Sequence, residues 1–592
     1  MLRWHKLTLE GPHDGALLLW ASLLCIQLWV GVAGAKPPAT PPAAAIASAH
    51  PLATAAGFEI LDAGGNAFDA AVAVSAALAV VEPYSSGLGG GGFWLLHRAA
   101  DGFETMLDGR ERAPQAATRG MYLGAQGEVI ADLSMDGALA AGIPGEPAAL
   151  AHLAERYGSL PLRESLAPAI RYAREGFAVD ALYQKLAGFR AKALNKSPQT
   201  AGLFLHKGEA PPLGHVIKQA ELAQTLEALV RDGHAGFYAG AVAKQLVDGV
   251  RAAGGIWTLD DLKAYRVIER APLRGQYRGI KITTAPPPSS GGVVLLTALN
   301  ILAGYDLDAL DETSRIHVIV EALRRAYRDR AEYLGDPDFI DMPITRLIHP
   351  FYAEGLRASI RLDRATPSAD LPGTRPSIDG PHTTHFSIID TQGNRVAATL
   401  SINYPFGAAL VVPGTGVLLN DEMDDFSVKP GVPNAYGLVG AEANAIAPGK
   451  RMLSSMTPTF LETEERVAIL GTPGGSRIIS MVLLGALEFA AGKPPQAWVT
   501  RSRFHHQYLP DVIQFEPEAI DALVQEDLAA LGHKLSEQGQ SYGNMQAVQW
   551  SKRTGRVEAA SDSRGVGAAE VRAMVLSNRP NTKDAKATKK PW

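Results

Sequence analysis

The C-terminal third of the chain contains hydroxyl, amide, carboxylate and glycine residues whose types together suit acyl transfer. Alone, each stretch has an ordinary interpretation as a strand, a turn or a solvated loop. Together they offer a nucleophile, donors for an oxyanion and charges for a zwitterionic substrate. The stretches are Thr383-Thr384-His385, Ser401-Ile402-Asn403, Asn420-Asp421-Glu422-Met423-Asp424-Asp425-Phe426, Ser454-Ser455-Met456 and Gly471-Thr472-Pro473-Gly474-Gly475-Ser476-Arg477.

Thr383 is the candidate nucleophile of this group. A threonine hydroxyl attacks a carbonyl only when a base takes its proton. If the bond between His382 and Thr383 were cut, the freed α-amine of Thr383 would be that base, because an α-amine has a pKa of about 7.7–8.0. Thr383 lies where a proline-rich connector, residues 364–382, meets a strand-like run, which is a suitable place for such a cut.

The other residues of the group fit the remaining needs of an acyl transfer. Two successive backbone N–H groups at Gly474 and Gly475 would form an oxyanion hole, where one donor typically contributes about 10²–10³ in rate. A substrate ammonium needs acidic partners, and a substrate carboxylate needs arginine or serine. Glu422 and Asp425 supply the acidic partners, while Ser454, Ser455 and an upstream arginine are available for the carboxylate.

Other catalytic designs have little support in the sequence. The glycine run at residues 89–92 lacks a following Gly-Lys-Ser/Thr and has no dinucleotide-binding spacing, so we interpret it as a turn where backbones approach closely. His505-His506 is adjacent and therefore a poor metal pair, and neither His-Glu-x-x-His nor Gly-x-Ser-x-Gly occurs. We expect no metal site and no cofactor.

The elements that must position these groups are mainly helices before the connector and strands after it. Apolar periodicity and the scarcity of helix breakers predict helices over residues 66–81, 147–157, 162–175, 222–232, 241–253, 313–333 and 478–491. Strand-like runs occupy residues 93–96, 385–390, 395–403 and 467–470, with a hairpin loop at 391–394. We expect the connector to be exposed rather than packed.

Composition narrows the class of protein. The 592 residues are 46% hydrophobic and carry a formal net charge of −5, which indicates a globular chain and argues against a nucleic-acid partner. The chain contains one cysteine, which excludes a disulfide framework, a Cys-ligated zinc site and an iron–sulfur cluster.

The N-terminus resembles an export signal. A weakly basic start precedes an apolar run over residues 16–32, and Ala33-Gly34-Ala35 follows as a small-x-small cleavage site. We therefore expect a signal peptide over residues 1–35 and a periplasmic or secreted product that leaves the membrane. Two alternatives stay open, an uncleaved anchor and lipid attachment at Cys25, although Leu23 and Leu24 are bulky for the latter.

Beyond these local features, the sequence resembles the γ-glutamyltranspeptidases, also called glutathione hydrolases, over nearly the whole mature chain. The group after the connector is the most specific part of the resemblance. The other matching blocks are His50-Pro51-Leu52-Ala53, Gly64-Gly65-Asn66-Ala67-Phe68-Asp69-Ala70-Ala71, Val80-Val81-Glu82-Pro83-Tyr84-Ser85-Ser86-Gly87, Pro286-Pro287-Pro288-Ser289-Ser290-Gly291-Gly292 and Tyr333-Leu334-Gly335-Asp336-Pro337.

The resemblance implies a fold and a maturation step. The fold is the α+β, four-layer αββα sandwich of the N-terminal-nucleophile hydrolases. The precursor would cut itself between His382 and Thr383 by attack of the Thr383 hydroxyl on the preceding carbonyl, an N-to-O acyl shift and hydrolysis of the ester. The products would be a large subunit, residues 36–382, and a small catalytic subunit, residues 383–592 with a frayed tail at 578–592, which stay together because their strands interleave.

The resemblance also implies a role for each matching site residue. Thr383 is the nucleophile, Gly474 and Gly475 form the oxyanion hole, and Ser401 supports Thr383 where the family usually has threonine. Because Ser401 keeps a hydroxyl, we expect slower or unchanged self-cleavage rather than its loss. The residues implied for the substrate's α-carboxylate are Arg110, Ser454 and Ser455, and those implied for its α-amino group are Asn403, Glu422 and Asp425.

The implied activity is cleavage of the γ-glutamyl amide of glutathione through a γ-glutamyl–Thr383 ester, which water, an amino acid or a dipeptide would resolve. Residues 430–440, including Tyr436, match a lid loop that favours small γ-glutamyl compounds over a polymer. A cephalosporin acylase for glutaryl side chains is the alternative enzyme, but Glu422 and Asp425 would then lack an ammonium partner. A non-catalytic exported γ-glutamyl-binding protein is the alternative of another class.

Overall fold

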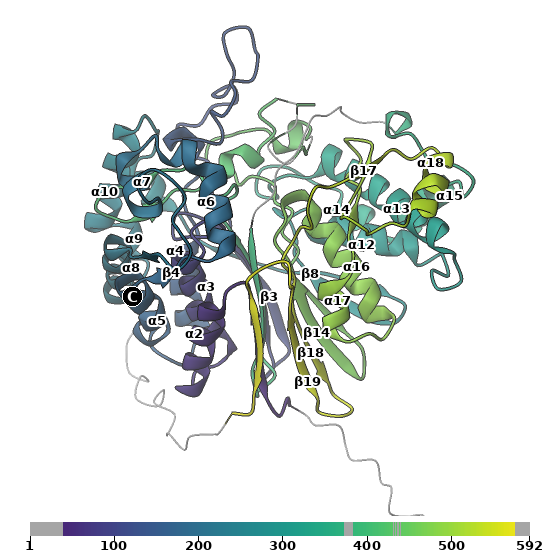
Figure 1. Ribbon diagram of the computed structural model, residues 1–592, viewed down its shortest axis with the longest axis horizontal. Helices are drawn as coiled ribbons and strands as arrows, with labels where there is room; N and C mark the ends of the chain where they lie inside the picture. Colours follow the sequence, from purple (N-terminus) through teal and green to yellow (C-terminus); the bar gives the residue numbers. More distant parts are fainter. Residues whose placement is uncertain are drawn as a thin grey trace, which may run out of the picture.

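Two β-sheets stacked face to face form the middle of the molecule, and helices cover the outer face of each sheet (Figure 1). The computed structural model describes residues 40–371, 383–429, 431–432, 434, 437–438 and 440–574. Within this part of the chain the first sheet has the strand order β20-β1-β9-β10-β2-β3-β6, and the second has the order β19-β18-β14-β13-β8-β7. Neighbouring strands pair antiparallel throughout both sheets.

Both sheets contain strands from each side of the connector. The first sheet comprises β1 (Ala44–Ser48), β2 (Gly91–Arg98), β3 (Phe103–Gly109), β6 (Ile268–Arg270), β9 (Thr384–Ile389), β10 (Arg395–Ser401) and β20 (Ala568–Arg572). The second comprises β7 (Leu273–Tyr277), β8 (Ile280–Thr284), β13 (Thr459–Glu462), β14 (Arg466–Gly471), β18 (Gln546–Ser551) and β19 (Val557–Ser561). Smaller sheets pair β4 (Phe177–Ala178) with β5 (Val216–Ile217), β11 (Val411–Val412) with β12 (Val417–Leu418), and β16 (Ile513–Phe515) with β15 (Phe504–His505) and β17 (Leu535–Glu537).

The helices divide into two outer layers by their place in the sequence. On the side of the first sheet lie α2 (Pro51–Asp62), α3 (Ala67–Val81), α4 (Glu146–Arg156), α5 (Leu162–Glu175), α6 (Ala181–Leu194), α7 (Pro198–Phe204), α8 (Ala220–Asp232), α9 (Ala235–Tyr238), α10 (Gly240–Ala252) and α11 (Leu259–Ala264). On the side of the second sheet lie α12 (Gly291–Leu302), α13 (Glu312–Tyr333), α14 (Ile344–Leu347), α15 (Pro350–Ala358), α16 (Ile478–Ala490), α17 (Pro495–Thr500) and α18 (Ala522–Ala530).

Three hydrophobic cores hold these four layers together. Alternate residues of one strand face opposite sides of a sheet, so Phe386 and Ile388 of β9 join the core under the first helix layer while Ile389 joins the core between the sheets. A third core lies between the second sheet and α12, α13 and α16. The predicted four-layer αββα sandwich is therefore confirmed.

Helix α3 shows how a predicted element is stabilised at its end. The Asn66 side chain accepts hydrogen bonds from the backbone of the first turn, and Asp69 accepts one from the Asn66 backbone, which forms a capping box. All residues of α3 are buried between β-strands and the neighbouring helices, because small alanine and valine side chains allow close packing. The helix begins one residue after the predicted start.

Two local features differ from the sequence-based expectation. Strand β10 ends at Ser401, two residues early, and Asn403 has a φ of 72°, a left-handed conformation that asparagine tolerates. Helix α12 was not predicted, because every residue except Asn300 is buried and the sequence therefore shows no amphipathic period.

In the described part of the connector, residues 364–371, four residues are exposed, three are half-buried and Ser368 is buried, so the connector is less exposed than expected. Ser368 is fully buried, where its hydroxyl accepts a hydrogen bond from Arg324 and its backbone N–H donates to Asp511. The expected signal segment, His382, Tyr436 and the expected tail lie outside the described residues.

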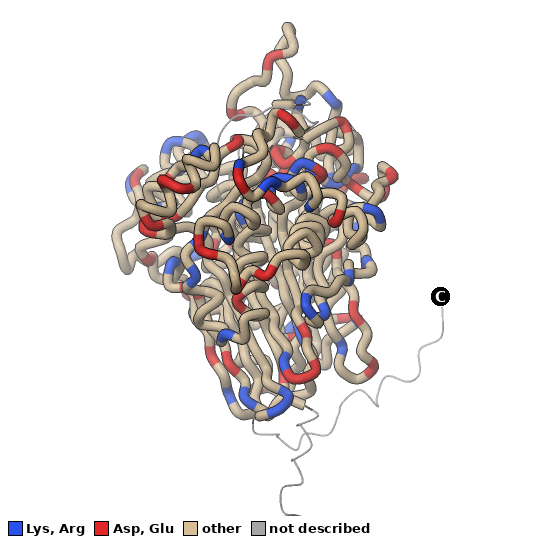
Figure 2. Tube along the Cα trace, turned by 90° about the vertical axis from the view of Figure 1, so that its right-hand side faces the viewer, with Lys and Arg blue, Asp and Glu red and all other residues tan. Residues whose placement is uncertain are grey.

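The described helices include none that is both long and apolar enough to cross a membrane. Figure 2 shows acidic and basic residues interspersed along the outer helices and the strand ends.

Candidate active site

A small cavity of about 20 Å³ lies beside the N-terminal end of β9. It brings together residues that are up to several hundred positions apart in the sequence. Its lining consists of Arg110, Thr383, Ser401, Asn403, Glu422, Asp425, Leu438, Ser454, Ser455, Met456, Gly475, Ser476 and Ile478. The predicted site residues of the described chain thus meet at one place, with Gly474 adjoining the lining.

Thr383 directly precedes β9 and is 7% exposed. The next residue, Thr384, donates a hydrogen bond from its hydroxyl to Glu82 Oε2 at 2.7 Å, and Tyr84 donates to Glu82 Oε1 at 3.2 Å. Burial raises the pKa of Glu82 to about 7, although the two hydrogen bonds oppose this shift. The N-terminal block around Glu82 therefore holds the end of the strand that carries the candidate nucleophile.

Ser401 and Asn403 reach the cavity from the neighbouring strand. The register pairs Leu400 of β10 with Thr384 of β9, so Ser401 lies at the level of Thr383. The Ser401 hydroxyl accepts a hydrogen bond from the Asn403 backbone N–H at 2.7 Å, and the Asn403 amide donates to the Asp421 carbonyl at 3.0 Å. These bonds fix the left-handed turn that directs Asn403 toward the cavity.

The glycine run at residues 89–92 supports this strand end by close backbone contact. A Cβ atom at Gly90 would lie 2.1 Å from the Ser401 carbonyl oxygen, and one at Gly92 would lie 2.4 Å from the Thr399 carbonyl oxygen. Only glycine permits such an approach, so the expected close backbone contact agrees with the structure, whereas the expected turn does not extend over Gly91 and Gly92, which begin β2.

Gly474 and Gly475 lie between β14 and α16, on the side of the cavity facing the second sheet. Their φ values of 142° and 55° suit glycine rather than other residues. The hydroxyl of Tyr327, from α13, donates a hydrogen bond to the Ser476 carbonyl oxygen and so fixes the following residue. This hydrogen bond anchors the loop in which the backbone N–H groups of Gly474 and Gly475 would stabilise an oxyanion.

Glu422 and Asp425 lie in a short 3-10 helix, η3 (Glu422–Asp425). Residues three apart eclipse each other in a 3-10 helix, so both carboxylates face the same side, where they meet Arg110. Arg110 Nη1 lies 2.5 Å from Glu422 Oε2, and Nη2 donates to Asp425. Arg110 also lies 3.5 Å from Glu111. The residues expected to bind opposite charges of a substrate therefore pair with each other.

Burial controls the ionisation of this group. It raises the pKa of Glu422 to about 7, with Arg110 opposing the shift, and it raises the pKa of Asp425 and Glu111 as well. Burial lowers the pKa of Arg110, but the three carboxylates outweigh burial and raise it overall. Arg110 accordingly stays charged, while a proton is retained among the carboxylates near neutral pH.

Ser454 and Ser455 form another wall of the cavity. The Ser454 backbone N–H donates to the Pro288 carbonyl at 2.8 Å, and the Ser290 backbone N–H donates to the Ser454 carbonyl at 2.8 Å. The proline-rich block at residues 286–292 therefore fixes the backbone of Ser454, directly before Ser455.

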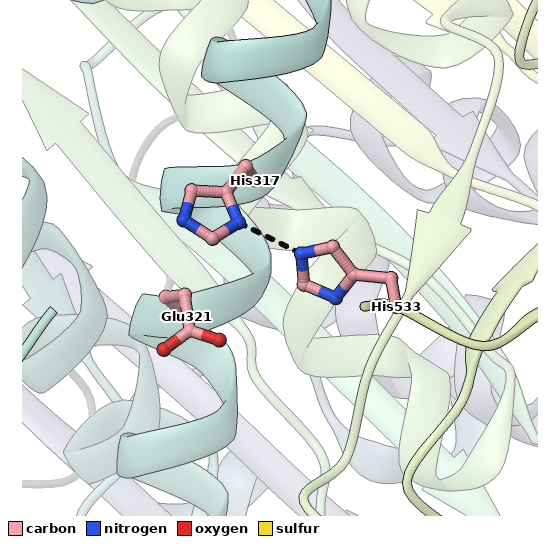
Figure 3. Close-up of side chains that lie close together, drawn as sticks. All are labelled: His317, Glu321 and His533. Carbon is pink, nitrogen blue, oxygen red and sulfur yellow. Dashed lines mark hydrogen bonds between the residues drawn. The ribbon is translucent and has the colours of Figure 1, made fainter. Parts of the chain in front are cut away.

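A group of three possible metal ligands lies away from this cavity. Figure 3 shows His317 and Glu321 on one face of α13 with His533 opposite them. His317 and His533 share a 2.7 Å hydrogen bond, and Glu321 pairs with Arg324 at 3.1 Å and Arg325 at 2.5 Å. Because two guanidinium groups already neutralise Glu321, we assign no metal to this group.

Sequence reasoning missed several residues around the cavity. Asn434 donates to Asp425 at 3.1 Å from the predicted lid segment. Arg330 of α13 contacts Ser455 from behind the wall. Four further lining residues had no role assigned to them: Leu438 lies in the predicted lid segment, Met456 and Ser476 lie in the stretches singled out in the sequence, and Ile478 lies outside both. Ile478 directly follows the Gly471–Arg477 stretch, which could have indicated it, whereas no local pattern marks Arg330.

The sequence model of the gamma-glutamyltranspeptidase family matches residues 53–572. The chain belongs to this family. It is 42% identical over 528 residues to a glutathione hydrolase proenzyme of Pseudomonas sp. (strain A14), covering 88% of this chain and 91% of that protein. It is 40% identical over 533 residues to the glutathione hydrolase proenzyme of Escherichia coli (strain K12), covering 88% and 90%.

A solved structure supports the fold of this family member. The crystal structure of a cephalosporin acylase from Bacillus halodurans superposes with a TM-score of 0.78 at 30% identity, covering 90% of this chain and 96% of that one. The sequence-based recognition of the family and of its fold class is confirmed.

Proposed function

We propose that this gamma-glutamyltranspeptidase family member is a self-processing glutathione hydrolase and γ-glutamyltransferase. The observation that carries the proposal is the meeting of Thr383 with Arg110, Glu422 and Asp425 in one buried cavity. The nucleophile there lies beside groups able to bind both charges of an α-amino acid. The 42% identity to a glutathione hydrolase proenzyme supports the same activity.

Activation and turnover use Thr383 in two different states. In the precursor the Thr383 nitrogen is a peptide amide and is not basic, so the hydroxyl must first attack the His382 carbonyl and shift that acyl group onto oxygen. This shift breaks the bond to the Thr383 nitrogen and frees the α-amine, and hydrolysis of the ester then frees the Thr383 hydroxyl and leaves a carboxylate on His382. In turnover the amine takes the hydroxyl proton while the Thr383 oxygen attacks the γ-glutamyl carbonyl, and backbone N–H groups at Gly474 and Gly475 stabilise the oxyanion.

The amine of the donor then leaves, and a second step removes the acyl group from Thr383. Collapse of the tetrahedral species transfers the proton to the nitrogen of the departing amine, which for glutathione is cysteinylglycine. A γ-glutamyl ester remains on Thr383. Water resolves the ester to glutamate, or the amine of an amino acid or dipeptide takes the acyl group, with the Thr383 amine again accepting and returning the proton.

The charges of the cavity suit the free α-carbon end of a γ-glutamyl group. The substrate carboxylate would bind Arg110, Ser454 and Ser455, and its ammonium would bind Asn403, Glu422 and Asp425. A volume of about 20 Å³ holds roughly one water molecule. The Arg110 ion pairs must therefore open as the substrate enters, and only a zwitterion re-pairs both signs at once.

We further propose the processing and location of the enzyme. Cleavage at Thr383 yields the large subunit, 36–382, and the small subunit, 383–592, after removal of the signal peptide, 1–35. The apolar run followed by Ala33-Gly34-Ala35 supports export to the periplasm or the medium. Residues 430–440, with Tyr436, would cover the bound γ-glutamyl group.

The cephalosporin acylase fold relative makes glutaryl transfer the second candidate function. A glutaryl group keeps the carboxylate but lacks the α-amine. Glu422 and Asp425 would then be desolvated without a cationic partner from the substrate, which disfavours binding. The γ-glutamyl donor is therefore preferred.

The test begins with the intact mass of the purified protein under denaturing conditions. We expect two fragments, one beginning at Thr383, and a single chain for Thr383→Ala. The cleaved enzyme should then hydrolyse γ-glutamyl-p-nitroanilide with at least a tenfold higher kcat/KM than glutaryl-p-nitroanilide. A stable single wild-type chain, or a preference for the glutaryl donor, would overturn the proposal.

A further inference from the structure

Arg330 is a buried arginine behind the wall that carries Ser454 and Ser455. It lies in the last turn of α13, and 4% of its surface is exposed. Its Nε atom donates to the Ser290 hydroxyl at 2.9 Å, and its Nη2 atom donates to the Ser455 hydroxyl at 3.4 Å. Among the described residues no carboxylate lies within 4.0 Å of this guanidinium.

The hydrogen bonds of Arg330 continue to both serines of the wall. Ser290 accepts from Arg330 and donates its own hydroxyl proton to the Ser454 carbonyl at 2.7 Å. Ser290 belongs to the Pro286–Gly292 block, whose backbone approach is so close that a Cβ at Gly291 would lie 2.2 Å from the Thr457 hydroxyl. The hydrogen bonds of Ser290 therefore connect the Arg330 charge to the closely packed Pro286–Gly292 block and to Ser454 in the cavity wall.

Ser455 can transmit the polarising effect of the Arg330 charge to a ligand in the cavity. Its oxygen accepts from Arg330, while its hydroxyl proton has no acceptor among the described residues. Donation into a hydroxyl oxygen makes the hydroxyl a stronger donor. Because Ser455 lines the cavity, its proton is free for an anionic group bound there.

A buried guanidinium without a carboxylate partner is costly. The positive charge of Arg330 opposes the rise in the pKa of Asp425 that burial causes, and burial lowers the pKa of Arg330 itself. A ligand anion beside Ser455 would supply the missing negative charge. The same contacts also admit a purely structural role, in which Arg330 only ties α13 to two loops, and the test must separate the two roles.

We infer that Arg330 is a positioning residue of the carboxylate subsite: it orients and polarises Ser455 and, in addition to Arg110, supplies a second positive charge for the α-carboxylate of the donor. This inference rests on the proposed function, because it concerns the same acyl donor.

The test compares three donors with one leaving group on the self-cleaved enzyme. γ-Glutamyl-p-nitroanilide has the α-carboxylate and the α-amine, glutaryl-p-nitroanilide keeps the carboxylate, and 4-aminobutyryl-p-nitroanilide keeps the amine. We expect Arg330→Gln to lower kcat/KM about tenfold to a hundredfold for the first two donors, mainly through KM. That range corresponds to losing one charge-assisted hydrogen bond. The carboxylate-free donor should change less than threefold.

Two further variants complete the experiment. Arg330→Lys keeps the charge and should recover part of the loss, whereas Arg328→Gln, the same change on α13 at a side chain that contacts Asp329, should leave all three donors unaffected. An equal loss of kcat/KM for all three donors in Arg330→Gln would overturn the inference in favour of a structural tie. The same conclusion would follow if Arg330→Gln failed to self-cleave and Arg330→Lys lost kcat/KM equally for all three donors. A wild-type enzyme inactive on the γ-glutamyl donor would instead overturn the proposed function.

Discussion

Arg110 lies between Glu422 and Asp425, and we propose that this buried ion triad governs which substrates the cavity accepts. Removing a charge from water is costly unless a partner compensates. In the structure the partner of each charge is another protein group, with Glu422 at 2.5 Å from Arg110. In our proposal a bound zwitterion would exchange these pairs for pairs with the substrate, so it would add no unpaired charge to the interior.

Donor preference should depend on pH because of Glu422, whose pKa is raised to about 7. Below pH 7 Glu422 is neutral, which weakens binding of a donor ammonium but relieves a donor that lacks one. The ratio of kcat/KM for γ-glutamyl over glutaryl p-nitroanilide should therefore fall as the pH drops below about 7, by up to about tenfold per unit, and level off above it.

The ratio is the quantity to measure, since titration of the Thr383 amine affects both donors and cancels. In self-cleaved Glu422→Gln the step near pH 7 should disappear. A ratio that stays constant in the wild-type enzyme from pH 5 to 8 would show that Glu422 does not receive the donor amine.

At the scale of elements, the active site depends on how closely β9 and β14 approach across the two sheets. His385 follows the candidate nucleophile by two residues, and its ring packs against Gly471 at the end of β14. Burial lowers the pKa of His385 to about 3, so the ring is neutral, and it hydrogen-bonds Thr399 at 2.8 Å. The contact sets the separation between the nucleophile strand and the loop carrying Gly474.

Gly471→Ala should disturb both stability and chemistry. The added Cβ would lie 2.2 Å from the His385 ring, and overpacking of this kind typically costs about 1–3 kcal/mol. We expect a lower urea midpoint and, because the two sides of the site move apart, slower self-cleavage and a lower kcat.

The matched control is Gly355→Ala in α15, where no atom lies within 4 Å of the added Cβ. An alanine inside a helix is favoured over glycine by up to about 1 kcal/mol, so this variant should be as stable as the wild type or slightly more so. Equal urea midpoints for Gly471→Ala and the wild type would mean that the sheets adjust without cost.

Over the whole molecule, the predicted cut at Thr383 would leave both fragments built into the same sheets. In the first sheet, β1 lies between β20 and β9. Strand β1 precedes the connector in the sequence, whereas β20 and β9 follow it. In the second sheet β8 pairs with β13 across the same divide. Each fragment alone would expose broken strand edges and open cores, which makes separation unfavourable.

The cleaved protein should therefore behave as one cooperative unit. We expect a single peak in size-exclusion chromatography, at the elution volume of uncleaved Thr383→Ala, although denaturing electrophoresis shows two chains. Both fragments should lose structure in the same urea transition. Release of either fragment without denaturant would contradict this expectation.

The sequence by itself determined the chemical groups, the family and the amphipathic helices. Thr383, the glycine pair at residues 474–475 and helix α5 were predictable because each depends on residue type and on spacing within one short segment. The amphipathic period of α5 reproduces its observed bounds, Leu162–Glu175.

Only the tertiary structure decided which of these groups meet and what supports them. Arg110 contacts Asp425 across 315 positions, and Arg330 reaches Ser455 across 125. Such pairs leave no local pattern, because sheet pairing and core packing join them through space rather than along the chain. For the same reason the sequence offered Arg110 and Glu422 as substrate partners, and the folded chain revealed that they first partner each other.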